Sequence, residues 1–170
     1  QFEYIRKSVL AFNLPSVDLA NYEADDLIAT YVEQILQKGA KVTIVSSDKD
    51  LMQLFRKNVR IFDPMKNKFI TDEDVQNKFG VDSSKVIDVQ ALAGDSSDNV
   101  PGVPGIGVKR AVSLLEEKGY NWSTVVFAFK EKDLGEDIAL QNARLAKILT
   151  VCDYDHGLCK PILWTPTASD

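Results

Sequence analysis

Three short clusters of carboxylates are the residues of this chain best suited to chemistry. Their members are Glu23, Asp25 and Asp26, then Asp48 and Asp50, and finally Asp95 and Asp98. Carboxylate oxygens are the ligands that hard divalent cations such as Mg²⁺ and Mn²⁺ prefer. Seven carboxylates are too many for one Mg²⁺ but suit a site that holds two ions. Two ions about 3.5–4 Å apart can promote an in-line displacement at phosphorus, so the clusters indicate phosphoryl or phosphodiester chemistry.

Each cluster also has a purely structural explanation. Acids in the first turn of a helix are stabilised by the helix dipole, by up to about 1 kcal/mol each. Asp48 and Asp50 fit a helix cap with a solvated charge, and Asp95 and Asp98 fit turn positions. Taken together, the three clusters favour metal binding. All of them lie where predicted elements begin or end, and the second follows a predicted strand.

Composition excludes several other classes of protein. Hydrophobic residues make up 45% of the 170 residues and charged residues 26%, as in globular proteins, and no apolar run is long enough to span a membrane. The two cysteines cannot form a disulfide framework or a zinc site, so we interpret Cys152 and Cys159 as ordinary buried or partly buried thiols. The only histidine, His156, fits a surface loop. These features predict a reducing, cytoplasmic setting.

Net charge does not decide whether the partner is nucleic acid. The chain carries 25 acids and 20 bases, a net charge of −5. Setting aside the seven clustered acids leaves 18 acids against 20 bases. If the clusters bind divalent cations, their charge is largely cancelled and phosphate is no longer repelled.

A glycine-rich stretch, Val103–Ala111, gives the most specific signal for a nucleic-acid partner. Gly105 and Gly107 bracket Ile106, and two basic residues follow in the first turn of the next predicted helix. Exposed backbone amides at a helix N-terminus bind anions. An ordinary tight loop before a helix is the alternative, but the full spacing is that of a helix–hairpin–helix motif. Such motifs bind the phosphate backbone without reading base edges.

The elements that must position these residues alternate between helix and strand in the first half. A helix is predicted over Tyr22–Lys38, capped by Asn21 and ended by Gly39. Strands follow at Lys41–Ser46, which should be buried on both faces, at Val59–Phe62 and at Lys68–Ile70, with a short helix around Leu51–Leu54 between the first two. This order predicts an α/β fold with a parallel central sheet flanked by helices, whose ligands bind at the carboxyl ends of the strands.

The second half is predicted to be helical throughout. One helix starts at Thr71-Asp-Glu-Asp74 and ends at Gly80. Further helices are expected from Ser83 or Ser84 to Ala93, over Val108–Lys118 and over Glu136–Thr150. In the first half, a helix with one apolar face is also expected at Gln1–Phe12, before the core. The predicted division is therefore an α/β core over residues 1–84 and a helical subdomain over 85–170, with Pro161–Asp170 as a linker.

Three motifs together resemble the 5′-nuclease domains of bacterial DNA polymerases I, relatives of the flap endonucleases. They are Tyr22-Glu-Ala-Asp-Asp26, Ser46-Ser-Asp-Lys-Asp-Leu-Met-Gln-Leu54 and Ala93-Gly-Asp-Ser-Ser-Asp-Asn-Val-Pro-Gly-Val-Pro-Gly-Ile-Gly107. The resemblance implies a PIN-like core and a nuclease that hydrolyses DNA near the 5′ end of a flap or nick. It implies two Mg²⁺ or Mn²⁺ ions on all seven acids, with the six aspartates Asp25, Asp26, Asp48, Asp50, Asp95 and Asp98 as the catalytic set.

The same resemblance implies the partners. DNA would contact the hairpin residues Gly102, Gly105, Ile106, Gly107, Val108, Lys109 and Arg110, and a K⁺ or Na⁺ ion would bind hairpin carbonyls. A polymerase domain would follow in the same polypeptide. The protein is expected to be a monomer that associates with the bacterial nucleoid.

The chain departs from the family at its start. The family has a further N-terminal strand with a metal-binding Asp, a second Asp, and a helical arch with basic residues, and none of these precedes Gln1. We therefore expect a piece of a longer polypeptide that binds DNA but cleaves it weakly or not at all.

Two competing hypotheses come from other classes of protein. A haloacid-dehalogenase-like phosphatase also places Asp-x-Asp after a strand, but here no Thr follows Asp50 at the required spacing and the later acids are one residue too close. That class also has no use for a glycine hairpin. A DNA-binding module without catalysis is the stronger alternative.

Overall fold

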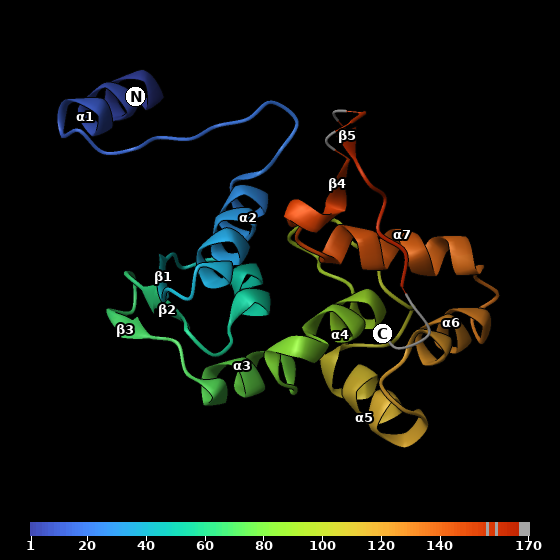
Figure 1. Ribbon diagram of the computed structural model, residues 1–170. Coiled ribbons are helices and arrows are strands. Elements are labelled where there is room, and N and C mark those ends of the chain that lie inside the picture. Colours follow the sequence, from blue (N-terminus) through green and yellow to red (C-terminus); the bar gives the residue numbers. More distant parts are fainter. Residues whose placement is uncertain (156, 159, 167–170) are drawn as a thin grey trace.

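The computed structural model describes residues 1–155, 157–158 and 160–166. The chain forms an α/β half and a helical half that lie side by side (Figure 1). The first half contains α1 (Phe2–Ala11), α2 (Ala24–Gln37), β1 (Val42–Val45), the 3₁₀ helix η1 (Asp50–Leu54), β2 (Val59–Asp63), β3 (Lys68–Phe69) and α3 (Asp72–Phe79). The second contains η2 (Ser83–Lys85), α4 (Val86–Ala93), α5 (Val108–Lys118), α6 (Trp122–Lys130), α7 (Glu136–Ala146), η3 (Val151–Asp153), β4 (Tyr154–Asp155) and β5 (Lys160–Pro161).

The central sheet is small and mixed. β1 pairs parallel with β2, as predicted, and β3 pairs antiparallel with β2. Ile44, Val59 and Ile61 point into the core, but Thr43 and Val45 face solvent, and Val45 is 65% exposed. The prediction that the first strand is buried on both faces is therefore wrong. α2 packs on β1, and η1 packs on β2.

The N-terminus of α2 is capped by acidic residues of its own first turn. The N-cap is Glu23, and the side chain of Asp26 accepts a hydrogen bond from the Glu23 backbone N–H (3.2 Å). Asn21, the predicted cap, lies outside the helix with a φ of +68°. Such reciprocal use of first-turn side chains satisfies amide groups that have no partner within the helix. The prediction was wrong because the acid two residues further on supplies the cap.

Local signals set the ends of other helices as predicted. Thr71 and Asp74 form a capping box at the start of α3, and Gly80 ends it with a φ of +74°. α5 spans the predicted residues. At η2 the cap is Asp82, which accepts from the Ser84 N–H (3.0 Å), rather than either serine.

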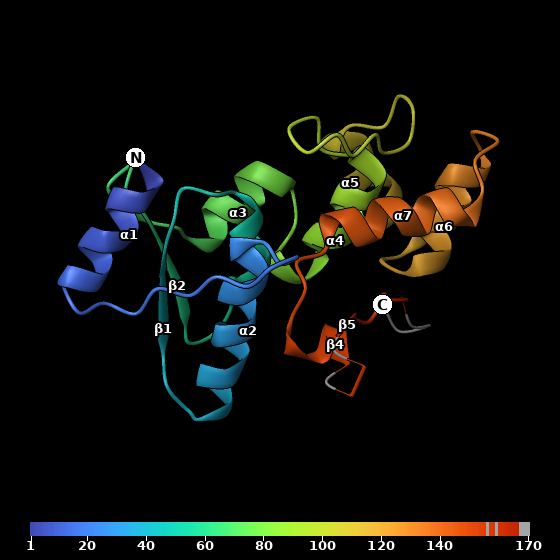
Figure 2. The same ribbon diagram turned by 90° about the horizontal axis from the view of Figure 1, so that it is seen from above.

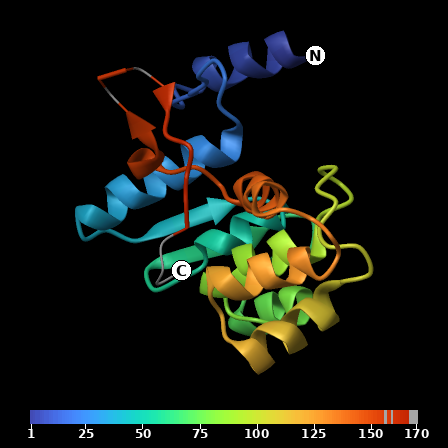
Figure 3. The same cartoon turned by 90° about the vertical axis from the view of Figure 1, so that its right-hand side faces the viewer.

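The helical half is organised around α4. Val86, Val89 and Leu92 are fully buried, and α5, α6 and α7 all pack on this helix (Figure 3). The sequence did not predict α6, because its segment is rich in aromatic and β-branched residues, which have low intrinsic helix propensity. Buried side chains such as Phe129 hold it in place. The core continues from this half into the sheet.

The last predicted helix is shorter than expected. α7 ends at Ala146 instead of Thr150, and Lys147 has extended backbone angles. Beyond it the chain forms the β4–β5 hairpin, so the prediction that the second half is helical throughout is wrong at this end. The Arg144 side chain donates to the Trp164 carbonyl (2.7 Å). The residues of the predicted linker up to 166 therefore partly pack on α7. His156, Cys159 and residues 167–170 lie outside the described residues. Cys152 is exposed, neither buried nor partly buried as predicted.

The first helix stands apart from the rest. α1 is joined to α2 by an extended segment and buries none of its residues (Figures 1 and 2). The apolar side chains of Phe2, Ile5 and Phe12 are 84%, 58% and 79% exposed. Across the described ranges, no helix is both long and apolar enough to cross a membrane.

Candidate metal centre

All seven carboxylates line one cavity of about 500 Å³ between the two halves of the molecule. The N-terminus of α2 supplies Glu23, Asp25 and Asp26; the segment from β1 into η1 supplies Asp48 and Asp50; and the loop after α4 supplies Asp95 and Asp98. The remaining walls come from α4 and from the end of α7. Residues that are up to 75 positions apart in the sequence, such as Glu23 and Asp98, therefore share one space.

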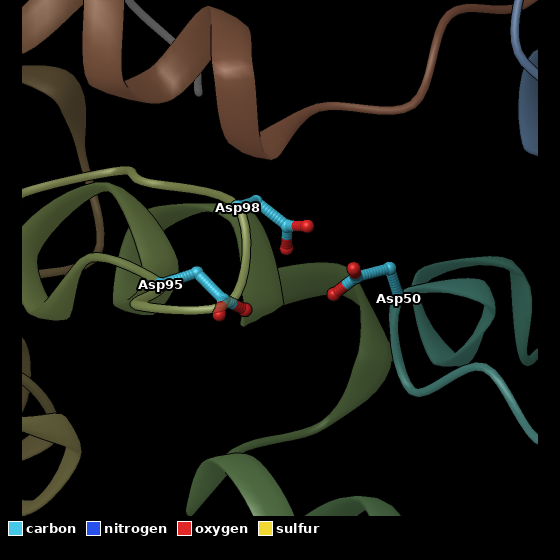
Figure 4. A group of neighbouring side chains, drawn as sticks. All are labelled: Asp50, Asp95 and Asp98. Carbon is cyan, nitrogen blue, oxygen red and sulfur yellow. The ribbon is translucent and has the colours of Figure 1, made fainter.

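Three of the aspartates form the tightest group. One carboxylate oxygen each from Asp50, Asp95 and Asp98 lies within 4.8 Å of the other two. Figure 4 shows that Asp50 points from η1 toward the loop, and that Asp95 and Asp98 point back toward it. An oxygen-only donor set of this kind suits a hard divalent cation such as Mg²⁺ or Mn²⁺.

Burial makes the negative charge in this cavity costly. Desolvation, followed by the charges of Asp26 and Glu23, raises the pKa of Asp25 above its ordinary value. Desolvation also raises the pKa of Asp50, and the nearby Asp48 and Asp95 add to that rise. Carboxylates whose ionised form is disfavoured in this way gain from a bound cation, which offsets both burial and repulsion.

The carboxylates are oriented by local hydrogen bonds. The Ser46 hydroxyl accepts from the Asp48 N–H (3.1 Å), and Asp48 Oδ1 accepts from the Asp50 N–H (3.0 Å). At the other wall, Asp26 Oδ1 accepts from the Leu149 N–H (2.9 Å). Asp26 thus ties the start of α2 to the segment that follows α7.

Two linked side-chain amides, Gln90 and the partly buried Gln53, hold Asp50. Gln90, which is 5% exposed on α4, donates from Nε2 to Asp50 Oδ1 (3.0 Å), and its Oε1 accepts from Gln53 Nε2 (3.1 Å). Gln53 Nε2 also donates to the Ala146 carbonyl (2.6 Å), and Gln53 Oε1 accepts from the Ile148 N–H (3.4 Å). These bonds replace helical ones at the end of α7, which explains its early termination. They also join η1, α4 and α7 beneath the cavity.

A lysine lies among the acids. Lys49 Nζ forms a short ion pair with Asp95 Oδ2 and donates to Ser97 Oγ (2.7 Å). Burial alone would raise the pKa of Asp95, but the hydrogen bonds from Lys49 and Ser97 outweigh it and the pKa is lowered. Burial works against the charged ammonium as well, yet the bond to Asp95 and the nearby acids raise the pKa of Lys49.

The loop that carries Asp95 and Asp98 is closed by backbone contacts. Asp95 and Val100 exchange two backbone hydrogen bonds (2.8 and 2.9 Å). Gly94 and Gly102 have φ angles of +71° and +64°, and a Cβ at either would lie 2.4 Å from a backbone atom of the neighbouring segment. The acidic loop and the glycine hairpin are therefore packed directly against each other.

The hairpin residues differ in accessibility. Gly102 is buried, and its N–H donates to the Oδ1 of Asn142, a side chain that is itself 1% exposed (2.9 Å). Ile106 is half-buried, and its N–H donates to the Val103 carbonyl (2.9 Å). The other predicted contact residues are exposed: Gly105, Gly107, Val108, Lys109 and Arg110.

Sequence reasoning did not find the residues that support the acids. Lys49 was visible as the basic residue between Asp48 and Asp50, and that position is the signal that could have found it. Gln53 and Gln90 carry no such signal, because an isolated glutamine in a helical pattern indicates neither burial nor a partner. Only the packing of α4 against η1 brings these two amides together.

Fold and site together define an α/β core and a helical half that share one cavity lined by carboxylates, and comparison with protein families identifies this architecture. The model of the 5'-3' exonuclease N-terminal resolvase-like domain matches residues 1–80, and that of the 5'-3' exonuclease C-terminal SAM fold matches residues 81–158. The chain belongs to the 5'-3' exonuclease family.

Curated relatives carry two names. A DNA polymerase I of Rhizobium leguminosarum is 58% identical over 119 residues, covering 70% of this chain and 12% of the relative. A DNA polymerase I of Caldicellulosiruptor bescii is 40% identical over 166 residues, covering 90% of this chain and 19% of the relative. A 5'-3' exonuclease of Aquifex aeolicus is 39% identical over 161 residues, covering 91% and 55%. The chain thus spans between about an eighth and about half of the length of these relatives.

Solved structures show the same fold. A bacteriophage T5 5'-exonuclease mutant superimposes with a TM-score of 0.73 at 24% identity, covering 86% of this chain and 64% of the other. A T5 flap endonuclease in a pseudo-enzyme-product complex with DNA and metal ions gives the same TM-score and identity, with 86% and 58% covered. The predicted fold class, an α/β core followed by a helical subdomain, is confirmed.

Proposed function

We propose that this chain is the 5′→3′ exonuclease and structure-specific flap endonuclease domain of a DNA polymerase I, and that it hydrolyses DNA phosphodiesters. The observation that carries this proposal is the convergence of seven carboxylates from three distant segments on one cavity. Family membership and relatives named DNA polymerase I and 5'-3' exonuclease support it. Replication and repair are the processes in which such a domain acts.

The donor set fits two Mg²⁺ or Mn²⁺ ions. Asp50, Asp95 and Asp98 would hold one ion, and the acids at the start of α2, with Asp48, would complete the site. Bound ions would supply positive charge at the scissile phosphate and lower the pKa of the attacking water. A T5 flap endonuclease solved with metal ions supports metal binding as such. The amides of Gln53 and Gln90 keep the Asp50 carboxylate turned toward the cavity.

The glycine hairpin is proposed to bind the phosphate backbone of duplex DNA. The N–H groups of Val108 and Lys109, at the first positions of α5, have no acceptor within the helix. Lys109 and Arg110 add positive charge there. Because Gly102 is buried and gives its N–H to Asn142, it supports the hairpin and leaves the contact to its exposed neighbours. This contact carries no base information.

The potassium ion implied by the family resemblance stays a prediction. Carbonyls of the hairpin would hold it, and one of them, that of Gly105, accepts a long hydrogen bond from Arg110 Nη1 (3.5 Å). A second lone pair of the Gly105 carbonyl would remain for a cation.

The wider assignments extend the predictions made from the sequence. We propose an α/β unit over residues 1–84 and a helical unit over residues 85–170, acting as a monomer. A polymerase domain in the same polypeptide and a cytoplasmic, nucleoid-associated location complete the proposal. The DNA polymerase I relatives, which are far longer than this chain, support a polymerase domain in cis.

A DNA-binding module without catalysis is the alternative, and Asp98→Ala separates the two. Asp98 lies in the tightest acidic group and is exposed to the cavity. In a nuclease the change should abolish Mn²⁺-dependent cleavage of a 5′-flap substrate, while affinity for the same DNA in EDTA changes less than about twofold. Gel-resolved cleavage and fluorescence anisotropy measure the two quantities.

Glu117→Ala provides the control, because this exposed acid on α5 lies outside the cavity. It should leave both quantities unchanged. If neither the chain nor the longer polypeptide shows metal-dependent cleavage to lose, the binding module is the correct reading. Comparing these 170 residues with the longer polypeptide also tests the prediction that the chain alone cleaves weakly or not at all.

A further inference from the structure

Lys49 is a cation held beside the acidic cavity by an ion pair with Asp95, one of the residues that line it. Its side chain is 29% exposed, and that of its partner Asp95 is 14% exposed. The negative charges of Asp50, Asp95 and Asp98 all stabilise the positive charge of its ammonium group. These three aspartates are the group whose oxygens lie within 4.8 Å of one another. The lysine therefore supplies positive charge at the same place where the donor set suits a divalent cation.

Both oxygens of Asp95 are already engaged. Oδ1 accepts from the Ser97 backbone N–H (3.0 Å) and from the Ser97 hydroxyl. Oδ2 accepts from Lys49 Nζ. The Ser97 contacts belong to a turn that is fixed by the pairing of Asp95 with Val100. The Ser97 N–H is fixed in the turn, whereas the lysine side chain and the Ser97 hydroxyl can leave Asp95 by side-chain rotation, and only the lysine carries a charge.

We propose that Lys49 is a built-in competitor of a divalent cation: its ammonium neutralises Asp95 in the metal-free protein and must leave when a cation binds there. This inference rests on the proposed metal site. Two positive charges on one carboxylate repel each other, so a cation at Asp95 Oδ2 competes with the Lys49 ammonium for that oxygen. In the metal-free protein the pair limits repulsion among the three aspartates. The lysine thereby sets the metal affinity of the site.

Isothermal titration with Mn²⁺ tests the affinity. Lys49→Met keeps the length of the side chain and removes its charge. A partly exposed ion pair that no longer has to be broken corresponds to about a fivefold gain in Mn²⁺ affinity for one ion. Lys49→Arg, which keeps the charge, should bind within about twofold of wild type. Lys66→Met removes a lysine paired with Asp63 outside the cavity and should leave the affinity unchanged.

A second measurement uses the protein with its wild-type sequence. Acetylation of Lys49 by acetic anhydride, followed by peptide mass spectrometry, should increase severalfold in Mn²⁺ relative to EDTA, because release from Asp95 frees the amine. Unchanged or reduced acetylation, or a Lys49→Met affinity equal to or below that of wild type, would overturn the inference. If the wild-type chain binds no Mn²⁺ at all, the proposed metal site fails instead.

Discussion

Asp63 lies outside the acidic cavity, yet it fixes the chain that leads into it. It is 2% exposed at the end of β2, and its Oδ1 accepts hydrogen bonds from the Ser47 hydroxyl (2.6 Å) and from the Met65 and Lys66 N–H groups (2.9 and 3.2 Å). The bond to Ser47 ties the end of β1 to the end of β2, immediately before Asp48. These donors favour the ionised carboxylate, and the Ser47 bond contributes most to lowering the pKa of Asp63 to about 2.

This lowered pKa predicts how stability depends on pH. The unfolded carboxyl titrates near 3.9, about two units higher, so ionised Asp63 stabilises the fold fully above that value. The contribution declines as the pH falls from about 4 to about 2. Asp63→Asn should therefore lower the free energy of unfolding at pH 5–7, and the difference from wild type should shrink below pH 4. Urea unfolding monitored by circular dichroism measures it.

Asp18→Asn is the control, since its carboxylate forms only an exposed pair with Arg6 (3.6 Å). Such pairs contribute little. A difference between Asp63→Asn and wild type that stays constant from pH 6 to pH 3 would contradict the prediction.

The loop from Gly94 to Gly107 connects the acids to the hairpin as one element. Gly94 and Gly102 approach so closely that neither has room for a side chain, and the Val103 N–H donates to the Leu92 carbonyl (2.7 Å). The buried Asn142 bridges this loop to α7, accepting from the Gly102 N–H and donating to the Ile138 carbonyl (2.8 Å). Backbone packing thus fixes the distance between the glycine hairpin, which is proposed to bind DNA, and the acidic cavity.

Three glycine substitutions test that packing. Gly102→Ala places a Cβ 2.4 Å from the Gly94 nitrogen at a φ of +64°, and should cost about 2–5 kcal/mol or prevent folding. Gly105→Ala has the same backbone strain (φ +79°) but open space, and should cost about 1 kcal/mol. Gly107→Ala, at φ −97° with open space, should be close to neutral. Urea unfolding gives the order; equal costs at positions 102 and 105 would refute it.

At the scale of the whole molecule, the acidic cavity joins the two halves. Five of its acids come from the α/β half and two from the helical half. Two hydrogen bonds cross the same junction: the Leu149 N–H donates to the Asp26 carboxylate, and the Gln53 side chain donates to the Ala146 carbonyl. Without a cation, the carboxylates repel one another across this junction. A bound ion should therefore stabilise the contact between the halves.

Metal binding should accordingly raise the melting temperature. A ligand that binds only the folded state at 100 times its dissociation constant adds about 2.7 kcal/mol to the free energy of unfolding. Mn²⁺ should raise the Tm in differential scanning calorimetry, and EDTA should reverse the rise. Asp50→Asn combined with Asp98→Asn should remove most of it. Glu117→Ala should show the full rise, and an equal rise in the double variant would place the stabilising ion elsewhere.

The sequence predicted elements where the deciding interactions are local. The capping box at Thr71, the glycine at position 80 and the span of α5 follow from residues within a few positions of each other. The three acidic motifs and the glycine hairpin could also be predicted from the sequence, because their chemistry depends on residue type and short spacing. These were sufficient to indicate the family and the candidate metal-binding residues.

Tertiary structure decided what depends on distant partners. The segment of α6 becomes helical through burial of Phe129, and α7 ends at Ala146 because Gln53 competes for its last backbone groups. The ion pair of Lys49 with Asp95 and the bond of Gln90 to Asp50 join residues about 40 or more positions apart. Short-range patterns in a sequence determine caps, turns and motif chemistry, whereas contacts between distant segments exist only once burial has brought those segments together.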